Sequence, residues 1–180
     1  MAKRIVIFST KGGVGKTLVA CNLAVSLARN QRQRVCLVDL DLGGLGDIAR
    51  MLNINPQRAM ADLIHALKKQ STGFKKDDFL THTSQGLDFL PGVLKPQQSS
   101  HLEPNMIKEV FNLLDKDYDY IIVDAGKNFS EVLVAALNQA NLILLVVTPD
   151  ILSVYQTKWA LDTLQFLHLP LAMVKIVLNR

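Results

Sequence analysis

The chain has 180 residues, of which 49% are hydrophobic and 20% are charged, with 20 Lys and Arg against 16 Asp and Glu. This balance is that of a single globular domain over residues 1–180, and it excludes disordered and collagen-like chains. The two cysteines match no C-x-x-C pair, which argues against zinc-ribbon, iron–sulfur and thioredoxin-like proteins and favours a reducing, cytoplasmic location.

The distribution of apolar and positive residues makes two classes of partner unlikely. The longest apolar run, residues 142–147, is too short to cross a bilayer, so we expect no direct membrane anchor in this chain. The excess positive charge is modest and spread along the sequence. This distribution favours a solvated surface over a stripe that binds nucleic acid.

Short apolar runs alternate with helix-length amphipathic segments, a pattern typical of a mostly parallel sheet buried between two layers of helices. We therefore expect a three-layer α/β fold. The expected strands are residues 4–8, 34–39, 87–90, 119–124, 142–148 and 174–179. The expected helices are residues 16–29, 46–52, 60–69, 104–115, 130–138 and 153–167, and the polar stretch 95–101 is expected to be a loop.

A glycine-rich loop joins the first expected strand to the first expected helix. Glycines lack a Cβ atom, which lets such a loop curl until its N–H groups point at phosphates, with the positive end of the helix behind them. Lys16 would neutralise the terminal phosphates, and the hydroxyl of Thr17 would ligate Mg²⁺. The sequence thus predicts a nucleotide site formed by Gly12, Gly13, Val14, Gly15, Lys16, Thr17 and Leu18.

Lys11 adds a second cation at the start of this loop, which reads Lys-Gly-Gly-Val-Gly-Lys-Thr over residues 11–17. Such a cation stabilises phosphate charge only if it turns inward or reaches the nucleotide of a neighbouring subunit. In this motif the chain resembles the MinD/ParA family of deviant Walker A ATPases. The resemblance implies a P-loop NTPase fold, ATP and Mg²⁺ as cofactors, and a homodimer formed on ATP binding, in which Lys11 contributes to catalysis from the partner subunit.

Three aspartates lie at or just after the carboxyl ends of two expected strands. Strand alternation places Asp39 and Asp41 on the same side, at the carboxyl end of a strand, where open α/β sheets bind ligands. The resemblance implies that Asp39 belongs to the outer shell of the metal, that Asp41 is the catalytic residue that positions the attacking water, and that Asp124 is the Walker B ligand of metal-bound water. Alternatively, Asp39 and Asp41 are turn and helix-cap residues.

The segment after Asp124 departs from the family pattern. Family members usually have a proline two residues after the Walker B aspartate, whereas this chain has Gly126 followed by Lys127. Glycine loosens the backbone there, and Lys127 adds a charge near the phosphates. We therefore expect slow hydrolysis in the absence of a partner.

Two further strand ends supply the residues that the resemblance assigns to the adenine base. Asn179 is expected to read the base through its side-chain amide, with Arg180 beside the ring and Pro149 lining the pocket. The alternatives are that Asn179 is a turn residue and that Pro149 only terminates a strand.

The segments 39–49, 52–56, 61–64, 87–92 and 148–154 most resemble the pilus-assembly branch related to CpaE and TadZ. This resemblance implies a switch that positions or regulates a pilus, secretion or cell-pole assembly and is recruited to a pole or a membrane-associated complex. Family members usually continue beyond the Asn-Arg step, so we expect the family's last carboxyl-terminal elements to be absent and the chain to be a piece of a longer protein or a shortened homologue. A nucleotide-binding scaffold with little hydrolysis and a DNA-partition ATPase are the alternatives.

Overall fold

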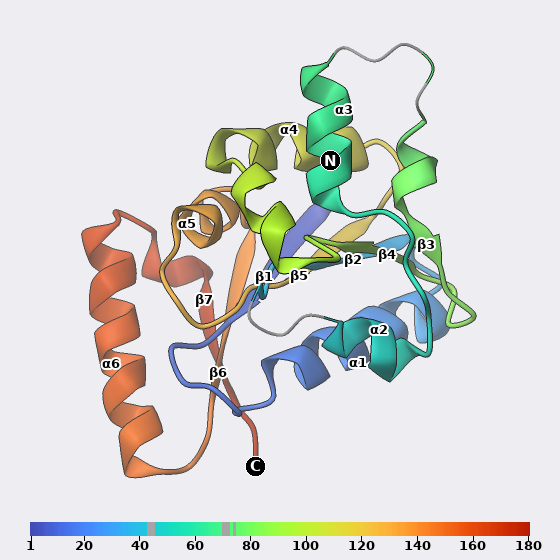
Figure 1. The fold of residues 1–180 in the computed structure, drawn as a ribbon. Coiled ribbons are helices and arrows are strands. Elements are labelled where there is room, and N and C mark those ends of the chain that lie inside the picture. Colours follow the sequence, from blue (N-terminus) through green and yellow to red (C-terminus); the bar gives the residue numbers. More distant parts are fainter. Residues whose placement is uncertain (43–45, 70–72, 74) are drawn as a thin grey trace.

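The computed structural model describes residues 1–42, 46–69, 73 and 75–180. Within these residues a seven-stranded sheet has the order β3-β4-β2-β5-β1-β6-β7 and runs through the centre of Figure 1. Neighbouring strands are parallel except for β3 and β4, which are antiparallel. The strands are β1 Lys3–Phe8, β2 Val35–Asp39, β3 Thr81–His82, β4 Asp88–Pro91, β5 Tyr120–Asp124, β6 Leu142–Val147 and β7 Val174–Leu178.

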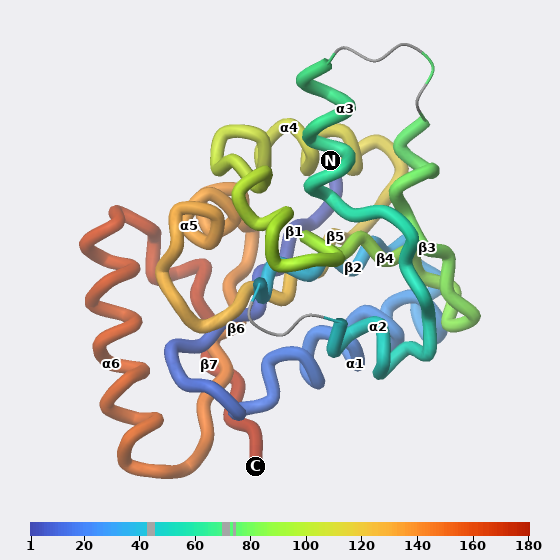
Figure 2. The backbone as a smooth tube through the Cα atoms, in the orientation of Figure 1, coloured from blue at the N-terminus to red at the C-terminus, as the bar shows by residue number. Residues whose placement is uncertain are grey.

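Helices cover both faces of the sheet (Figures 1 and 2). The α-helices are α1 Lys16–Asn30, α2 Asp47–Leu52, α3 Met60–Lys68, α4 Pro104–Leu114, α5 Glu131–Leu137 and α6 Ile151–Phe166. The 3₁₀ helices are η1 Lys76–Phe79, η2 Pro96–His101 and η3 Leu171–Met173. The described part of the chain contains no helix with the length and apolar character needed to cross a membrane.

The core is divided by the sheet into two halves. Because successive side chains of a strand point to opposite faces, Val6 and Phe8 of β1 pack with residues of α3, α4, α5 and α6, whereas Ile5 and Ile7 pack with residues of α1 and α2. This arrangement confirms the expected three-layer α/β fold. It also places the loop before α1 at the carboxyl end of β1, at the edge of the sheet where the parallel strands β5 and β2 end.

The structure corrects two details of the sequence prediction. The stretch 95–101 was expected to be a loop, but it contains η2, in which Pro96 is at the first position and the Ser99 hydroxyl donates a 2.7 Å hydrogen bond to the Pro96 carbonyl. Helix α6 begins at Ile151, two residues before the expected start, because the Asp150 side chain accepts a hydrogen bond from the Ser153 N–H and so caps the helix.

Candidate functional site

The loop between β1 and α1 has the backbone geometry of a phosphate cradle. Gly13 and Gly15 have φ angles of 75° and 91°, a left-handed conformation that side chains with a Cβ rarely adopt. Gly15 precedes α1, and its carbonyl accepts the first helical hydrogen bond, from the Val19 N–H at 2.9 Å. The N–H groups at the start of α1 have no partner within the helix, so they are available to an anion.

A cavity of about 420 Å³ opens over this loop. The side chains of Lys16 and Lys127 provide positive charge in its wall, and those of Asp41 and Asp47 provide negative charge. Among the described residues, the lining consists of Gly12, Gly13, Gly15, Lys16, Thr17, Asp41, Asp47 and Lys127. The structure therefore brings together the expected phosphate-binding residues of the loop and the aspartate expected to position water.

Two residues of the predicted nucleotide site have side chains outside this cavity. Val14 is buried in the core beside α1, and Leu18 is exposed on α1. Each can contribute to nucleotide binding only through its backbone N–H. Their assignment to the site remains a prediction.

Asp39 and Asp124 lie side by side at the ends of β2 and β5, where their Cα atoms are register partners. Burial raises the pKa of Asp39 to about 8, with a further contribution from the charge of Asp124. Burial also raises the pKa of Asp124 to about 6, although the hydrogen bond with Thr17 and the charge of Lys16 act in the opposite direction. The backbone N–H of Asp41 donates a 2.9 Å hydrogen bond to Asp39 Oδ1.

These buried carboxylates fit a hydrated magnesium ion. Asp124 Oδ1 is buried without a hydrogen-bond partner among the described residues, so it can accept a hydrogen bond from a metal-bound water. No group of three or more His, Cys, Asp or Glu residues in the described ranges could ligate a metal directly. Mg²⁺ usually keeps several waters and binds few protein groups, which suits Thr17 as a direct ligand and Asp39 and Asp124 as partners of its water.

Lys11 points away from the phosphate cavity in this single chain. Its Nζ is 2.6 Å from Asp150 Oδ2 and 3.4 Å from Thr148 Oγ1, at the start of α6. The hydrogen bond from Lys11, followed by those from the Thr148 hydroxyl and the Ser153 N–H, lowers the pKa of Asp150. Asp150 lies in the segment 148–154, but no sequence pattern indicated it as the partner of Lys11. The reach of Lys11 to another subunit stays a prediction.

Asn179 follows β7 and lies against the phosphate loop. Its Nδ2 donates a 2.9 Å hydrogen bond to the Val14 carbonyl, and a Cβ placed on Gly15 would come within 2.3 Å of the same Nδ2. The amide expected to read adenine thus also fixes the loop to the end of β7. Pro149 and Arg180 are exposed and do not line the phosphate cavity, and the base-binding roles of all three residues stay predictions.

The segment after Asp124 lies close to Asp41, the residue expected to position water. Gly126 has a φ of 42°, and a Cβ on it would lie 3.3 Å from Asp41 Oδ1. Lys127 follows and borders both the phosphate cavity and a cavity of about 260 Å³ formed with Asp41 and Ser130.

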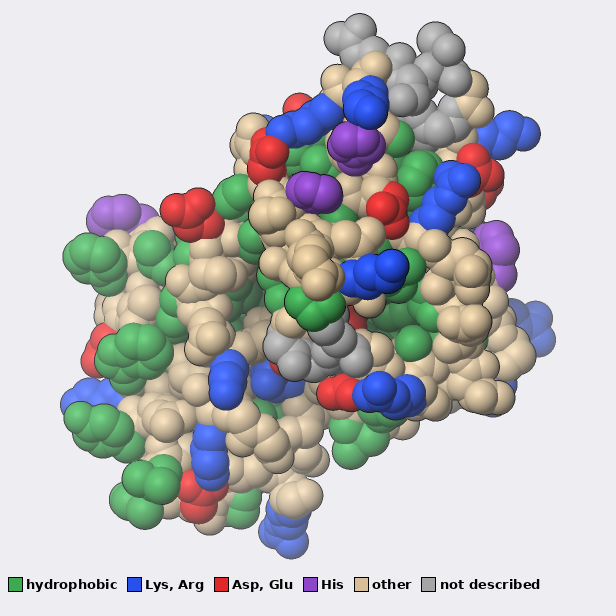
Figure 3. Space-filling view, viewed as in Figure 1, with side chains coloured by type: hydrophobic (Ala, Val, Ile, Leu, Met, Phe, Trp, Pro, Cys, Tyr) green, Lys and Arg blue, Asp and Glu red, His purple; other side chains and the backbone are tan. Residues whose placement is uncertain are grey.

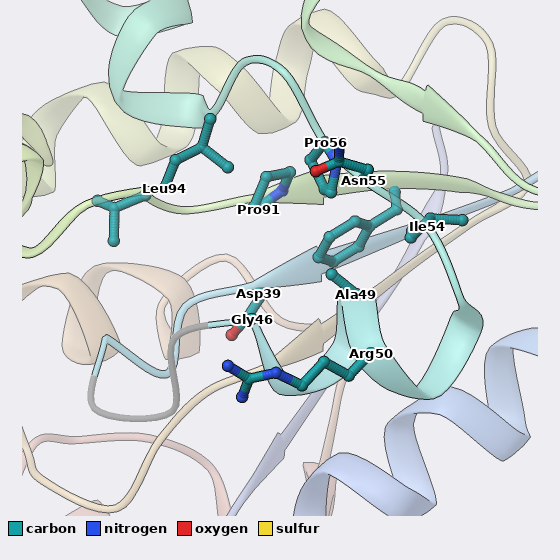
Figure 4. A pocket seen from close by; sticks show the side chains of 11 residues that line it. Asp39, Gly46, Ala49, Arg50, Ile54, Asn55, Pro56, Pro91 and Leu94 are labelled. Atoms are coloured by element: carbon teal, nitrogen blue, oxygen red, sulfur yellow. The ribbon is translucent and has the colours of Figure 1, made fainter.

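A further cavity of about 400 Å³ lies between α2 and the end of β4 (Figure 4). Its walls are mainly apolar and include Ile54, Phe89 and Pro91, with Asp39 and Arg50 as charged residues at its border. Asp39 therefore faces this cavity and does not line the phosphate cavity. Residues 43–45, which are part of the segment that resembles the pilus-assembly branch, lie outside the described residues.

Comparison with known sequences shows the family to which the chain is similar. Residues 2–172 match the model of a family described as an AAA domain. The septum site-determining protein MinD of Bacillus subtilis is 30% identical over 155 residues, which are 86% of this chain and 56% of that protein. The chain spans 50–65% of the length of the first curated relatives that it matches.

Comparison with solved structures gives the same fold. A ParA family ATPase from Chlorobium tepidum superposes with a TM-score of 0.89 and 27% identity, over 100% of this chain and 75% of that chain. The MinD protein of Pyrococcus horikoshii, solved as a complex with Mg-ADP, superposes with a TM-score of 0.78 and 25% identity, over 98% of this chain and 68% of that chain.

Proposed function

Because the chain belongs to the AAA-domain family of MinD/ParA P-loop ATPases, we propose that it is an ATP-dependent switch that positions or regulates a cellular assembly. The observation that carries this proposal is the cavity in which Lys16, Thr17 and Asp41 meet over the glycine loop. This arrangement provides a phosphate cradle, a metal ligand and a carboxylate for water in one place.

The residues in and beside the cavity are proposed to have different roles in phosphoryl transfer. The loop N–H groups and Lys16 would hold the phosphates, and Thr17 would ligate Mg²⁺. Asp124 would accept a hydrogen bond from a metal-bound water, and Asp39, its register partner outside the phosphate cavity, would belong to the outer shell of the metal. A bound Mg²⁺ would neutralise charge on the β- and γ-phosphate oxygens. Asp41 orients a water whose oxygen bonds to the γ-phosphorus, while the bond to the bridging oxygen breaks and releases ADP and phosphate.

ATP binding is proposed to drive dimerisation through Lys11, as in a deviant Walker A loop. In the single chain Lys11 is held by Asp150 in an ion pair whose side chains are 29% and 39% exposed. Exposed ion pairs contribute little free energy, so exchanging Asp150 for the phosphates of a partner subunit costs little. The phosphates would offer Lys11 a higher density of negative charge.

The assembly is proposed to belong to pilus or secretion machinery, from the resemblance to the CpaE and TadZ branch. Exposed apolar side chains on α6 support a protein partner, because monomeric proteins rarely leave such groups in one place without a binding role. Figure 3 shows hydrophobic side chains gathered over this helix, at the left of the view. Those exposed in its first three turns are Ile151, Leu152, Val154, Tyr155 and Trp159.

The proposal is tested by measuring phosphate release from Mg-ATP by the purified protein. We expect slow turnover, on the order of one per minute or less, against about 10 s⁻¹ for a median enzyme. The Lys16→Ala variant should release no phosphate above background. If the wild-type protein binds Mg-ATP without hydrolysing it, the protein is a nucleotide-binding scaffold; if it does not bind ATP, the proposed function is wrong.

A further inference from the structure

Two lysines besides Lys16, namely Lys11 and Lys127, are candidates for contact with the terminal phosphate. The structure places them differently relative to the phosphate cavity. Lys11, the lysine singled out by its sequence motif, is held at the start of α6 by Asp150 and does not line the phosphate cavity. Lys127, from the connection between β5 and α5, does line it. In a single subunit, therefore, Lys127 is the second cation of the cavity.

Lys127 lies directly over the phosphate loop. A Cβ placed on Gly12 would be 3.9 Å from both the Cδ and the Nζ of Lys127, so the ammonium lies close to the backbone of the cradle. The loop after β1 and the connection between β5 and α5 run side by side in both ribbon and tube views (Figures 1 and 2). An anion held by the loop N–H groups would therefore lie within reach of Lys127.

The ammonium of Lys127 is also without an ion-pair or hydrogen-bond partner among the described residues. Its side chain is exposed. Lys11, by contrast, must leave a carboxylate before it can bind a phosphate. Lysine is a flexible point charge that can follow an anion, so Lys127 can engage a phosphate without breaking an existing contact.

The backbone before Lys127 explains how the cation reaches this position. Gly126 has a φ of 42°, which turns the chain tightly past the Asp41 carboxylate. Proline has a fixed φ near −65°, so it could not adopt this turn. The glycine thus directs residue 127 toward the phosphate loop.

We propose that Lys127 binds the γ-phosphate of the nucleotide held by its own subunit and is the residue that distinguishes ATP from ADP before any second subunit arrives. This inference rests on the proposed function, because it requires a nucleotide in the phosphate cavity. It adds a contact within the subunit to the contact across the dimer expected of Lys11. Lys127 and Asp41 then act on the same phosphate, the first on its charge and the second on the attacking water.

The test compares the affinities for ADP and for the non-hydrolysable triphosphate AMPPNP, measured by calorimetry in the presence of Mg²⁺. In Lys127→Ala, AMPPNP affinity should fall about tenfold or more, as expected for the loss of one charged contact, while ADP affinity changes less than about twofold. Lys127→Arg should restore most of the AMPPNP affinity that Lys127→Ala loses. The control is Lys116→Ala, which removes an exposed lysine before β5, at the opposite end of that strand from the site.

Repeating the measurement in the Lys11→Ala background distinguishes the contact within the subunit from an effect of dimerisation. In that background, adding Lys127→Ala is expected to cause the same loss of AMPPNP affinity as it does in the wild-type protein. An equal loss for ADP and AMPPNP, or no loss for either, would overturn the role of Lys127 while leaving the proposed function intact. Failure of the wild-type protein to bind either nucleotide would overturn both.

Discussion

Lys16 is a buried lysine at the glycine loop. It is the first residue of α1, and its charge acts on Asp124 behind the cavity. Lys16→Ala should lower ATP affinity tenfold or more, because the N–H cradle remains but the cation facing the phosphates is lost. Calorimetry measures this loss, with Lys3→Ala, an exposed lysine at the start of β1, as the control. Wild-type affinity in Lys16→Ala would contradict the assignment of the loop.

Asp41 lines the same cavity as the phosphate-binding residues, but its substitution is expected to have a different effect. Its carboxylate lies close to Gly126 at the edge of this cavity. Asp41→Ala should slow hydrolysis by about 10² or more and leave ATP affinity within a few-fold, because only the orientation of water is lost. Single-turnover measurements test this, with the exposed Asp162→Ala on α6 as the matched variant. Unchanged turnover in Asp41→Ala would move the role to another residue.

At the scale of elements, Gly92 holds the end of β4 against the end of β2. Its N–H donates a 2.7 Å hydrogen bond to the Asp39 carbonyl, and a Cβ on Gly92 would be 2.6 Å from that oxygen. Gly92→Ala should lower the free energy of unfolding by roughly 1–3 kcal/mol, because backbone atoms must move to relieve the overlap. Urea denaturation measures the change.

The matched control for Gly92→Ala is Gly86→Ala. Gly86 has a φ of 85° but no atom within 4 Å of an added Cβ, so only its backbone strain is expected to cost stability, about 1 kcal/mol. A loss at position 92 no greater than that at position 86 would show that the end of β4 adjusts freely.

The amino-terminal end of β1 is fixed to α4 by a buried ion pair. Arg4 contacts Asp115 at 2.6 Å, and their side chains are only 8% and 9% exposed. Arg4 also donates to Asn112 and Gln139. Asp115→Ala should lower the free energy of unfolding by about 3–5 kcal/mol, because it leaves a charged guanidinium buried without its carboxylate.

The comparison for this ion pair is the exposed one on α2. The side chains of Arg50 and Asp47 are 78% and 58% exposed, so Arg50→Ala should cost about 1 kcal/mol or less. Similar losses in Asp115→Ala and Arg50→Ala, measured by denaturation, would show that burial does not strengthen the Arg4 pair.

The sequence predicts the elements well because their signals are local. Each of the six expected strands and six expected helices occurs in the structure, with ends that differ by at most two residues. Strand β3 was missed because two residues give no periodic pattern, and η2 was missed because a short 3₁₀ helix in a polar stretch has no apolar period.

The candidate site was predictable where a motif fixes geometry and unpredictable where distant segments meet. The glycine loop lies between a strand and a helix as its motif predicts, and Asp39 and Asp124 lie at the expected strand ends, although their side-by-side register was not predicted. The contacts of Lys11 with Asp150 and of Asn179 with Val14 join residues more than 130 positions apart, so no local pattern reveals them. The absence of the family's proline agrees with the φ of 42° at Gly126, which proline cannot adopt.

At the scale of the whole molecule, the proposed switch depends on the exchange of a contact within one subunit for a contact between two. Lys11 is bound to its own α6 in the single chain, and the same helix begins with exposed apolar residues. ATP should therefore shift Lys11 from Asp150 to the phosphates of a partner subunit. Lys11→Ala should still bind nucleotide, because Lys16 and the loop N–H groups remain.

The ATP-dependent switch is tested most directly by sedimentation velocity of the wild-type protein and Lys11→Ala with Mg-ADP or Mg-AMPPNP. The wild-type protein should sediment as a monomer with ADP and as a dimer with AMPPNP, whereas Lys11→Ala should stay monomeric with both. Calorimetry on the same samples should show that Lys11→Ala still binds AMPPNP. A wild-type protein that binds AMPPNP but stays monomeric, or a Lys11→Ala variant that dimerises as strongly as the wild-type protein, would contradict the account.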